Sequence, residues 1–182
     1  MYQAIQSGWH PPQSLTKEEY EYIKNNKDEK PHLTGFVGFG CSFAGKWFGG
    51  YAKSDDKRNY CLNAYNSVMS KMNNLKDAKF LCKDYKELNP KNSVIYCDPP
   101  YQGTTQYDKN IVGDFDTEQF WEYMRKWSKD NLVFISEYNA PEDFVCVWQK
   151  EVKLDIRDSN NKKKERIEKL FVHKNAYNTY LK

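Results

Sequence analysis

Four consecutive residues, Asp98-Pro99-Pro100-Tyr101, follow directly on the apolar run at 93–97. From average residue usage, this string should occur by chance in on the order of one in a thousand chains of this length. The Asp98 carboxylate and the Pro99 carbonyl can each accept a hydrogen bond from the same amine. The prolines fix the backbone without adding N–H donors. Such acceptors would localise the lone pair of a planar amine, for example N6 of adenine, which is otherwise delocalised into the ring. The motif therefore suits chemistry on such an amine.

Tyr101 adds a ring on which a base could stack. A base inside a duplex hides its N6 from a protein pocket, so it must be flipped out at a cost of a few kcal/mol, of which stacking returns about 1–3 kcal/mol. Phosphate contacts and hydrogen bonds in the pocket must supply the remainder. The plain structural alternative is a proline turn that leaves a strand, with Asp98 as its capping residue.

Two acidic residues follow predicted strands. Asp84 comes after the short apolar segment 79–82, and Asp98 comes after 93–97. Ligands of open α/β sheets bind at the carboxyl ends of the strands, so these carboxylates lie where a ligand is expected.

The remaining elements indicate how the motif is positioned. Periodicity and capping patterns predict helices over 16–24, 59–72 and 117–128, and apolar runs predict further strands at 132–135, 144–148, 152–156 and 169–173. Strands that follow one another without helices near the C-terminus favour antiparallel pairing there. The sequence thus predicts an α/β fold, with a mixed sheet that has an antiparallel C-terminal edge.

Residues 35–50 interleave glycines with aromatic residues, which predicts looped backbone with exposed rings. Basic residues lie around this stretch, although the net charge is only +3 and a solvated surface is an alternative for them. We expect residues 35–58 to form a loop region that faces DNA, and the candidate backbone or base contacts are Lys46, Trp47, Lys53 and Arg58.

Composition bounds the class of protein. A chain of 182 residues fits one domain, here 1–182, that buries a sizeable core. The five cysteines are odd in number and form no Cys-x-x-Cys pair, which argues against disulfides and against a metal site. No apolar run approaches the roughly 18 residues of a membrane helix, and no targeting segment is evident, so a soluble cytoplasmic protein is expected.

Several stretches together resemble the Dam-like (D12) class of DNA N6-adenine methyltransferases, particularly its phage-type members. Asp98-Pro99-Pro100-Tyr101 is similar to the catalytic motif of that class, and the flanking stretches that match are 35–51, 79–85, 115–119, 134–139 and 168–172. The resemblance implies a Rossmann-like methyltransferase sheet and transfer of a methyl group from S-adenosylmethionine to a flipped adenine in double-stranded DNA. It implies catalytic roles for Asp98, Pro99, Pro100 and Tyr101, and cofactor contacts from Asp84, Tyr85 and Asp98.

One part of the family pattern is not found. The family places a Phe-x-Gly-Gly cofactor turn, a Lys-containing motif and an acidic strand end ahead of the stretches matched here. The sequence therefore predicts a partial catalytic domain without the N-terminal strands, and a second polypeptide could supply the cofactor loop. Residues 36–40 (FVGFG) imitate such a turn and keep an alternative order of motifs open. Two further hypotheses are a non-catalytic remnant that binds DNA or a partner chain, and methylation of a different planar amine.

Overall fold

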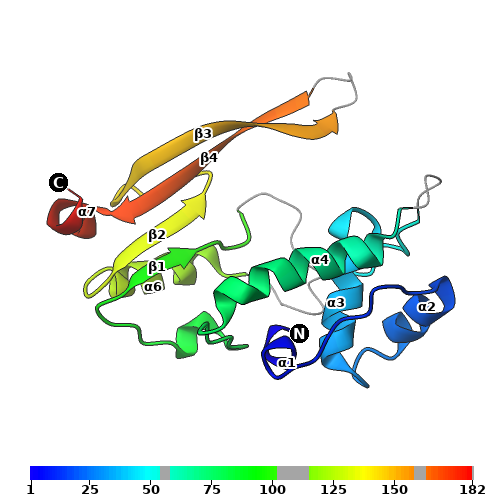
Figure 1. The fold of residues 1–182 in the computed structure, drawn as a ribbon. Coiled ribbons are helices and arrows are strands. Elements are labelled where there is room, and N and C mark those ends of the chain that lie inside the picture. The colour runs from blue at the N-terminus through cyan, green and yellow to red at the C-terminus, as the bar shows by residue number, and fades with distance from the viewer. Residues whose placement is uncertain (54–57, 102–114, 158–162, 182) are drawn as a thin grey trace. The chain divides into compact units, whose positions relative to one another are not determined.

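The computed structural model of the chain describes residues 1–53, 58–101, 115–157 and 163–181 (Figure 1). The chain, predicted as one catalytic domain, divides into two compact units, Met1–Cys82 and Lys83–Lys182. Each unit is described by itself.

The first unit is helical in its described residues. Its elements are α1 (Tyr2–Gln6), α2 (Lys17–Asn25), α3 (Pro31–Gly40), α4 (Tyr60–Met72) and the short 3₁₀ turns η1 (Phe43–Gly45) and η2 (Asn73–Leu75). The predicted capping box at the start of α2 is confirmed, because the Thr16 hydroxyl accepts from the Glu19 N–H and the Glu19 carboxylate accepts from the Thr16 N–H. Asn59 caps α4 by accepting from the Leu62 N–H, which confirms the predicted start of that helix.

Tyr20 is the centre of the first unit's core. Its ring is fully buried and packs against Phe48 and Tyr51, and its hydroxyl lies 2.8 Å from Oγ of the buried Ser42. A buried hydroxyl needs such a partner, because leaving it without a hydrogen bond costs about 1–3 kcal/mol. The Tyr20–Ser42 pair therefore joins α2 to the chain that leaves α3.

The predicted loop at 35–50 is wrong for residues 35–40, which form the C-terminal half of α3. Pro31 occupies the first turn of this helix, where its missing N–H costs nothing. Gly38 allows close packing, since a Cβ there would lie 2.3 Å from the Trp47 ring. The prediction of exposed rings holds for Phe39, Phe43 and Trp47, whereas Phe36 and Phe48 are buried. Tertiary packing over small residues has overridden the low helix propensity of glycine.

The strand predicted at 79–82 is also wrong. The segment carries no strand, and Leu81 is 55% exposed. Instead, α1 holds the segment through side chains: the Gln3 amide donates to the Phe80 carbonyl at 2.7 Å, and the Tyr2 ring stacks on Phe80. A run of apolar residues becomes a strand only when a neighbouring strand pairs with it, and the described residues provide none here.

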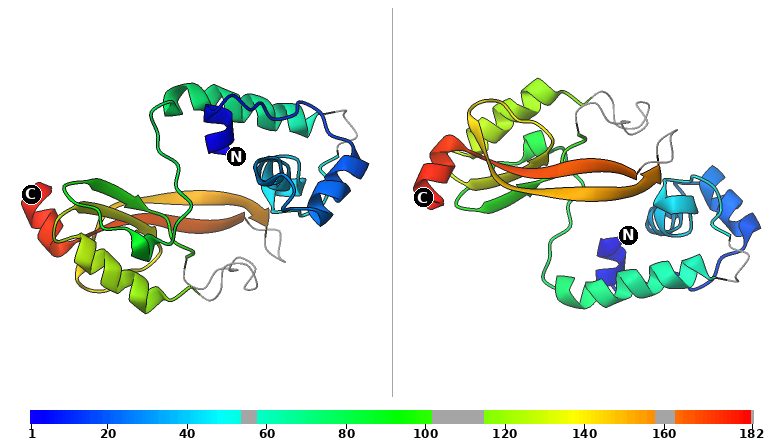
Figure 2. Two further views of the ribbon diagram at one scale, coloured as in Figure 1. Left: turned by 90° about the horizontal axis from the view of Figure 1, so that it is seen from below. Right: turned by 90° about the horizontal axis from the view of Figure 1, so that it is seen from above.

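The second unit contains a four-stranded mixed sheet. Its strands are β1 (Val94–Cys97), β2 (Leu132–Glu137), β3 (Phe144–Arg157) and β4 (Lys163–His173), in the order β1-β2-β4-β3. The pair β1–β2 is parallel, and the pairs β2–β4 and β3–β4 are antiparallel. The predicted mixed sheet with an antiparallel C-terminal edge is thus confirmed. The runs predicted at 144–148 and 152–156 belong to one long strand, β3, which forms a hairpin with β4 (Figure 2).

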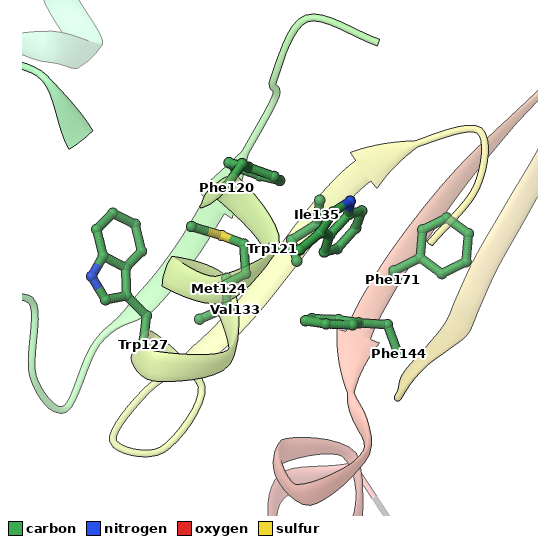
Figure 3. Close-up of a cluster of buried hydrophobic side chains, with 8 residues drawn as sticks. All are labelled: Phe120, Trp121, Met124, Trp127, Val133, Ile135, Phe144 and Phe171. Atoms are coloured by element: carbon green, nitrogen blue, oxygen red, sulfur yellow. The ribbon is translucent and has the colours of Figure 1, made fainter. Parts of the chain in front are cut away.

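Helix α6 (Thr117–Trp127) packs on one face of this sheet, as both views in Figure 2 show. Asp116 caps it by accepting from the Gln119 N–H at 2.9 Å. As predicted, the helix buries one face, and Figure 3 shows the resulting cluster with strand residues: Phe120, Trp121, Met124, Trp127, Val133, Ile135, Phe144 and Phe171. The 3₁₀ turn η3 (Tyr85–Glu87) and α7 (Lys174–Tyr180) complete the unit.

Polar contacts fix the ends of these elements. The buried Asn131 amide donates to the carbonyls of Trp127 and Pro90, and its oxygen accepts from the Ser93 N–H. This one side chain connects the end of α6 with the start of β1.

Asp143, before β3, accepts two hydrogen bonds from the Arg125 guanidinium, at 2.6 and 3.1 Å.

The two glycines of α3 give a matched pair of substitutions. Gly38→Ala should lower the free energy of unfolding by about 1–3 kcal/mol, because the added methyl displaces the Trp47 ring. In Gly35→Ala, the added Cβ meets only Met1 Cβ at 3.6 Å, which is an ordinary contact. This variant should raise the free energy of unfolding by about 0.5–1 kcal/mol. Urea denaturation of both variants measures the difference, and equal effects would contradict the helical packing described for Gly38.

Asp143 should make stability depend on pH. Its hydrogen bonds from Arg125 hold the pKa of the carboxyl below its ordinary value of 3.8, so the stabilisation is present above that value and disappears as the pH falls through the lowered pKa. Because both side chains are more than a third exposed, Asp143→Asn should cost only about 0.5–1 kcal/mol near neutral pH. Denaturation curves of wild type and variant should converge below pH 3.8. A constant difference across this range would contradict the ion pair.

Candidate active site

Asp98, Pro99 and Pro100 leave the carboxyl end of β1. Cys97 pairs with Ile135 of the parallel strand β2, so Asp98 comes level with the end of β2, where Ser136 and Glu137 lie. Asp98 is exposed, and the two prolines are half-buried. The motif therefore presents a carboxylate to solvent at the carboxyl ends of the strands, where ligands of α/β folds bind.

Tyr101 is fixed by its hydroxyl. The hydroxyl hydrogen-bonds to Oγ of Ser136 on β2 and donates to the Glu168 carboxylate on β4 at 3.1 Å. Burial raises the pKa of Tyr101 to about 12, and the neighbouring Glu168 carboxylate adds to this shift. These contacts attach the far end of the motif to two strands, so the backbone of Pro99 and Pro100 is held between β1 and Tyr101.

A second aromatic residue lies against Tyr101. The ring of Tyr138, just after β2, meets the Tyr101 ring edge-on, with centroids 4.6 Å apart. The Arg166 guanidinium donates to the Tyr138 hydroxyl at 2.7 Å. The exposed Arg166 thus places a permanent positive charge near the motif, which suits an anionic ligand such as a nucleic acid.

Glu137, at the end of β2, is only 4% exposed. Its carboxylate accepts from the Tyr138 N–H at 2.7 Å, which shapes the turn that carries the Tyr138 ring. In this structure Glu137 supports the backbone of the turn.

The two residues predicted for the cofactor differ in their surroundings. The Asp84 carboxylate is exposed and caps η3, and its hydrogen bond from the Lys86 N–H at 2.9 Å, together with the Lys86 ammonium, lowers the pKa of Asp84. The Tyr85 ring packs on α6, with centroids 5.9 Å from Phe120 and 5.5 Å from Tyr123. Asp84 therefore offers acceptor oxygens to a ligand, while Tyr85 anchors the turn that positions it.

The four residues predicted to contact DNA lie in the first unit. Lys46, Lys53 and Arg58 are exposed, and Trp47 is 38% exposed with one side against Phe39 and Phe48. Lys53 and Arg58 both line a cavity of about 250 Å³ in this unit. The structure leaves Lys46 and Trp47 outside that cavity lining.

The described residues contain no group of three or more His, Cys, Asp or Glu placed to hold a metal ion. Within the same part of the chain, none of the helices has the length and apolar character that crossing a membrane requires.

Sequence reasoning did not find the residues that support Tyr101. Ser136 is the only hydroxyl in the strand LVFISE, and a polar residue inside an apolar strand is the signal that could have identified it. Glu168 and Arg166 lie in a charged run in which nothing distinguishes them before the strands are paired.

Comparison with known proteins decides the family. Residues 44–178 match the family model of the D12 class N6 adenine-specific DNA methyltransferases. The chain belongs to this family. No match was found among curated proteins or among solved structures. D12-class methyltransferases act on adenine N6 in DNA and use S-adenosylmethionine, and the matched region includes Asp98 and the residues that hold Tyr101.

The environment of Tyr101 generates a prediction. Tyr101→Phe removes the hydroxyl that contacts Ser136 and Glu168, and it should lower the free energy of unfolding by about 1–2 kcal/mol. Because Tyr101 ionises near pH 12, wild type and variant should show the same tyrosinate absorbance when the pH passes through the ordinary value of 10.0. One fewer ionising tyrosine in the variant near 10.0 would contradict the buried hydroxyl.

Proposed function

We propose that this chain carries the catalytic residues of an enzyme that transfers a methyl group from S-adenosylmethionine to N6 of a flipped-out adenine in DNA. The observation that carries the proposal is the exposed Asp98 at the carboxyl end of β1, followed by two half-buried prolines and anchored at its far end through Tyr101. Membership of the D12 family supports the same reaction.

The motif acts on the amine by accepting a hydrogen bond from each of its two N–H groups. The Asp98 carboxylate accepts a hydrogen bond from one N6–H, and the Pro99 carbonyl accepts a hydrogen bond from the other. Together they favour a tetrahedral nitrogen with a localised lone pair. When bound, the sulfonium cofactor supplies the methyl group: N6 forms the new N–C bond, and the electron pair of the broken S–C bond goes to sulfur. The surplus N6 proton then leaves to solvent. The Tyr101 ring stacks on the flipped base.

In this proposal, Asp84 and Asp98 of the second unit bind the adenosine half of the cofactor. Asp84 and Asp98 are exposed carboxylates that can accept hydrogen bonds from hydroxyl and amino groups of adenosine. A glycine turn would bind the methionine carboxylate through backbone N–H groups. We propose that a second polypeptide supplies this turn.

Double-stranded DNA is the proposed substrate. Lys53 and Arg58, which share a cavity lining, would contact phosphate, and Lys46 and Trp47 would add backbone or base contacts. A second candidate function is a subunit that binds DNA or a partner chain without catalysis.

Asp98→Ala tests the assignment. In the active enzyme, the variant should transfer methyl groups to adenine at least about a hundredfold more slowly than wild type, because one of the two hydrogen-bond acceptors for N6 is lost. Affinity for duplex DNA should stay within about twofold, since phosphate contacts dominate affinity. Transfer is measured with isotope-labelled S-adenosylmethionine.

Asp130→Ala is the matched control, because it removes another exposed carboxylate of the same unit. It should leave both transfer and DNA affinity unchanged. Wild-type rates in Asp98→Ala would overturn the role of Asp98. Detectable binding of S-adenosylmethionine and adenine labelling by the chain alone would exclude the non-catalytic candidate.

A further inference from the structure

Two cysteines of the first unit lie against each other in its core. Cys41 directly follows α3, and Cys61 is the second residue of α4. Both are free thiols, with exposed fractions of 1% and 5%. They belong to one cluster of buried residues, and their side chains share a hydrogen bond. The fold therefore pairs two thiols whose spacing along the chain predicts no pair.

Other contacts hold each cysteine in place. The Cys41 carbonyl accepts from the Ala52 N–H at 3.0 Å, and the Cys61 thiol donates to the Pro12 carbonyl at 3.2 Å. Asn59 caps the helix turn that carries Cys61. A disulfide forms only where the two cysteine side chains already point toward each other, and a hydrogen bond between the thiols meets that condition.

A cavity gives access to these buried thiols. Cys41 and Cys61 both line the cavity of about 250 Å³ in this unit. A water molecule takes roughly 30 Å³ of liquid volume, so the cavity has room for an oxidant as small as hydrogen peroxide. The cations Lys53 and Arg58 belong to the same lining, and cationic surroundings favour the thiolate form of cysteine.

Cys61 is the more reactive thiol of the two. The hydrogen bond from Cys41 lowers the pKa of Cys61, whereas burial and the Glu19 carboxylate act in the opposite direction. The same hydrogen bond, together with burial, raises the pKa of Cys41. Cys61 also lies in the first turn of α4, where the helix dipole favours a negative charge. Because the thiolate is the nucleophile, Cys61 reacts first and Cys41 second.

We propose that Cys41 and Cys61 are a redox-sensitive pair, which a peroxide oxidises to a disulfide. The Cys61 thiolate attacks one peroxide oxygen, so that an S–O bond forms, the O–O bond breaks and hydroxide leaves. The Cys41 sulfur then attacks the sulfenic acid of Cys61, so that the S–S bond forms and the S–O bond breaks. The protons of both thiols go to the departing oxygens. Two electrons pass from the thiols to the peroxide, which leaves as two water molecules.

The disulfide would close residues 42–60 into a covalent loop. This segment carries the four candidate DNA contacts, Lys46, Trp47, Lys53 and Arg58. A disulfide restricts the conformations of the loop that it closes. Oxidation would therefore constrain the segment proposed to face DNA. The chemistry of the pair goes beyond the proposed function and does not depend on it.

Oxidation of the full chain tests the pair. The reduced chain is treated with hydrogen peroxide for increasing times, remaining thiols are alkylated after unfolding, and the peptides are mapped by mass spectrometry. Cys41 and Cys61 should appear in one linked peptide that lacks two hydrogen atoms, and dithiothreitol should restore both thiols. Burial raises the pKa of Cys97 to about 11, so the pair should react at least about tenfold faster than Cys97.

Two serine variants provide a matched comparison. Cys41→Ser removes the second thiol, so Cys61 should gain oxygen without forming the linked peptide. Cys82→Ser removes an exposed cysteine of the same unit and should leave the linkage unchanged. Circular dichroism checks that each variant is folded. Because the wild-type measurement decides the linkage by itself, the proposal stays testable even if a variant does not fold.

The peptide map separates the outcomes. A reversible link between Cys41 and Cys61 supports the proposal. Full alkylation of both residues after the exposed Cys82 has been oxidised would overturn it. Linkage of either residue to a different cysteine, within one chain or between two chains, would overturn it as well.

Discussion

The packing of α6 against the parallel pair β1–β2 is the constraint on which the second unit depends. Met124, fully buried on α6, reaches the sheet where Val133 and Ile135 of β2 are also fully buried. Asn131 links the end of α6 to the start of β1, so the two strands begin in register and end together. That register sets Asp98 level with Ser136. The chemistry at the motif is therefore positioned by an apolar core that does not itself take part in it.

Tyr101 connects this scaffold to the proposed reaction. Its hydroxyl reaches Ser136 on β2 and Glu168 on β4, so these two strands hold the far end of the motif while β1 holds the near end. A backbone carbonyl can act as a directed acceptor only when the chain on both sides of it is fixed. In the proposed mechanism, the mixed sheet provides both fixed ends.

Residue patterns predict the elements that depend on local signals. The capping residues Thr16, Asn59 and Asp116 and the apolar runs of β1 and β2 lead to the correct helices and strands. Two predictions are wrong because tertiary contacts decide the structure. Residues 35–40 belong to helix α3, which forms because Gly38 admits the Trp47 ring, and residues 79–82 form no strand because no described strand pairs with them. Within the candidate site, Asp98 and Tyr101 stand out as a motif. Ser136 and Glu168 do not, because their closeness to Tyr101 exists only once β2 and β4 have paired.

We propose that this chain carries the residues that bind the amine in an adenine N6 methyltransferase, with Asp98 as one of the two acceptors for N6. The most direct measurement is nucleoside mass spectrometry of duplex DNA incubated with S-adenosylmethionine, the full chain and the glycine-turn segment of a D12-class enzyme. We expect N6-methyladenine when both polypeptides are present and none when either is omitted. Methylation of a different base, or none from the assembled pair, would contradict the claim.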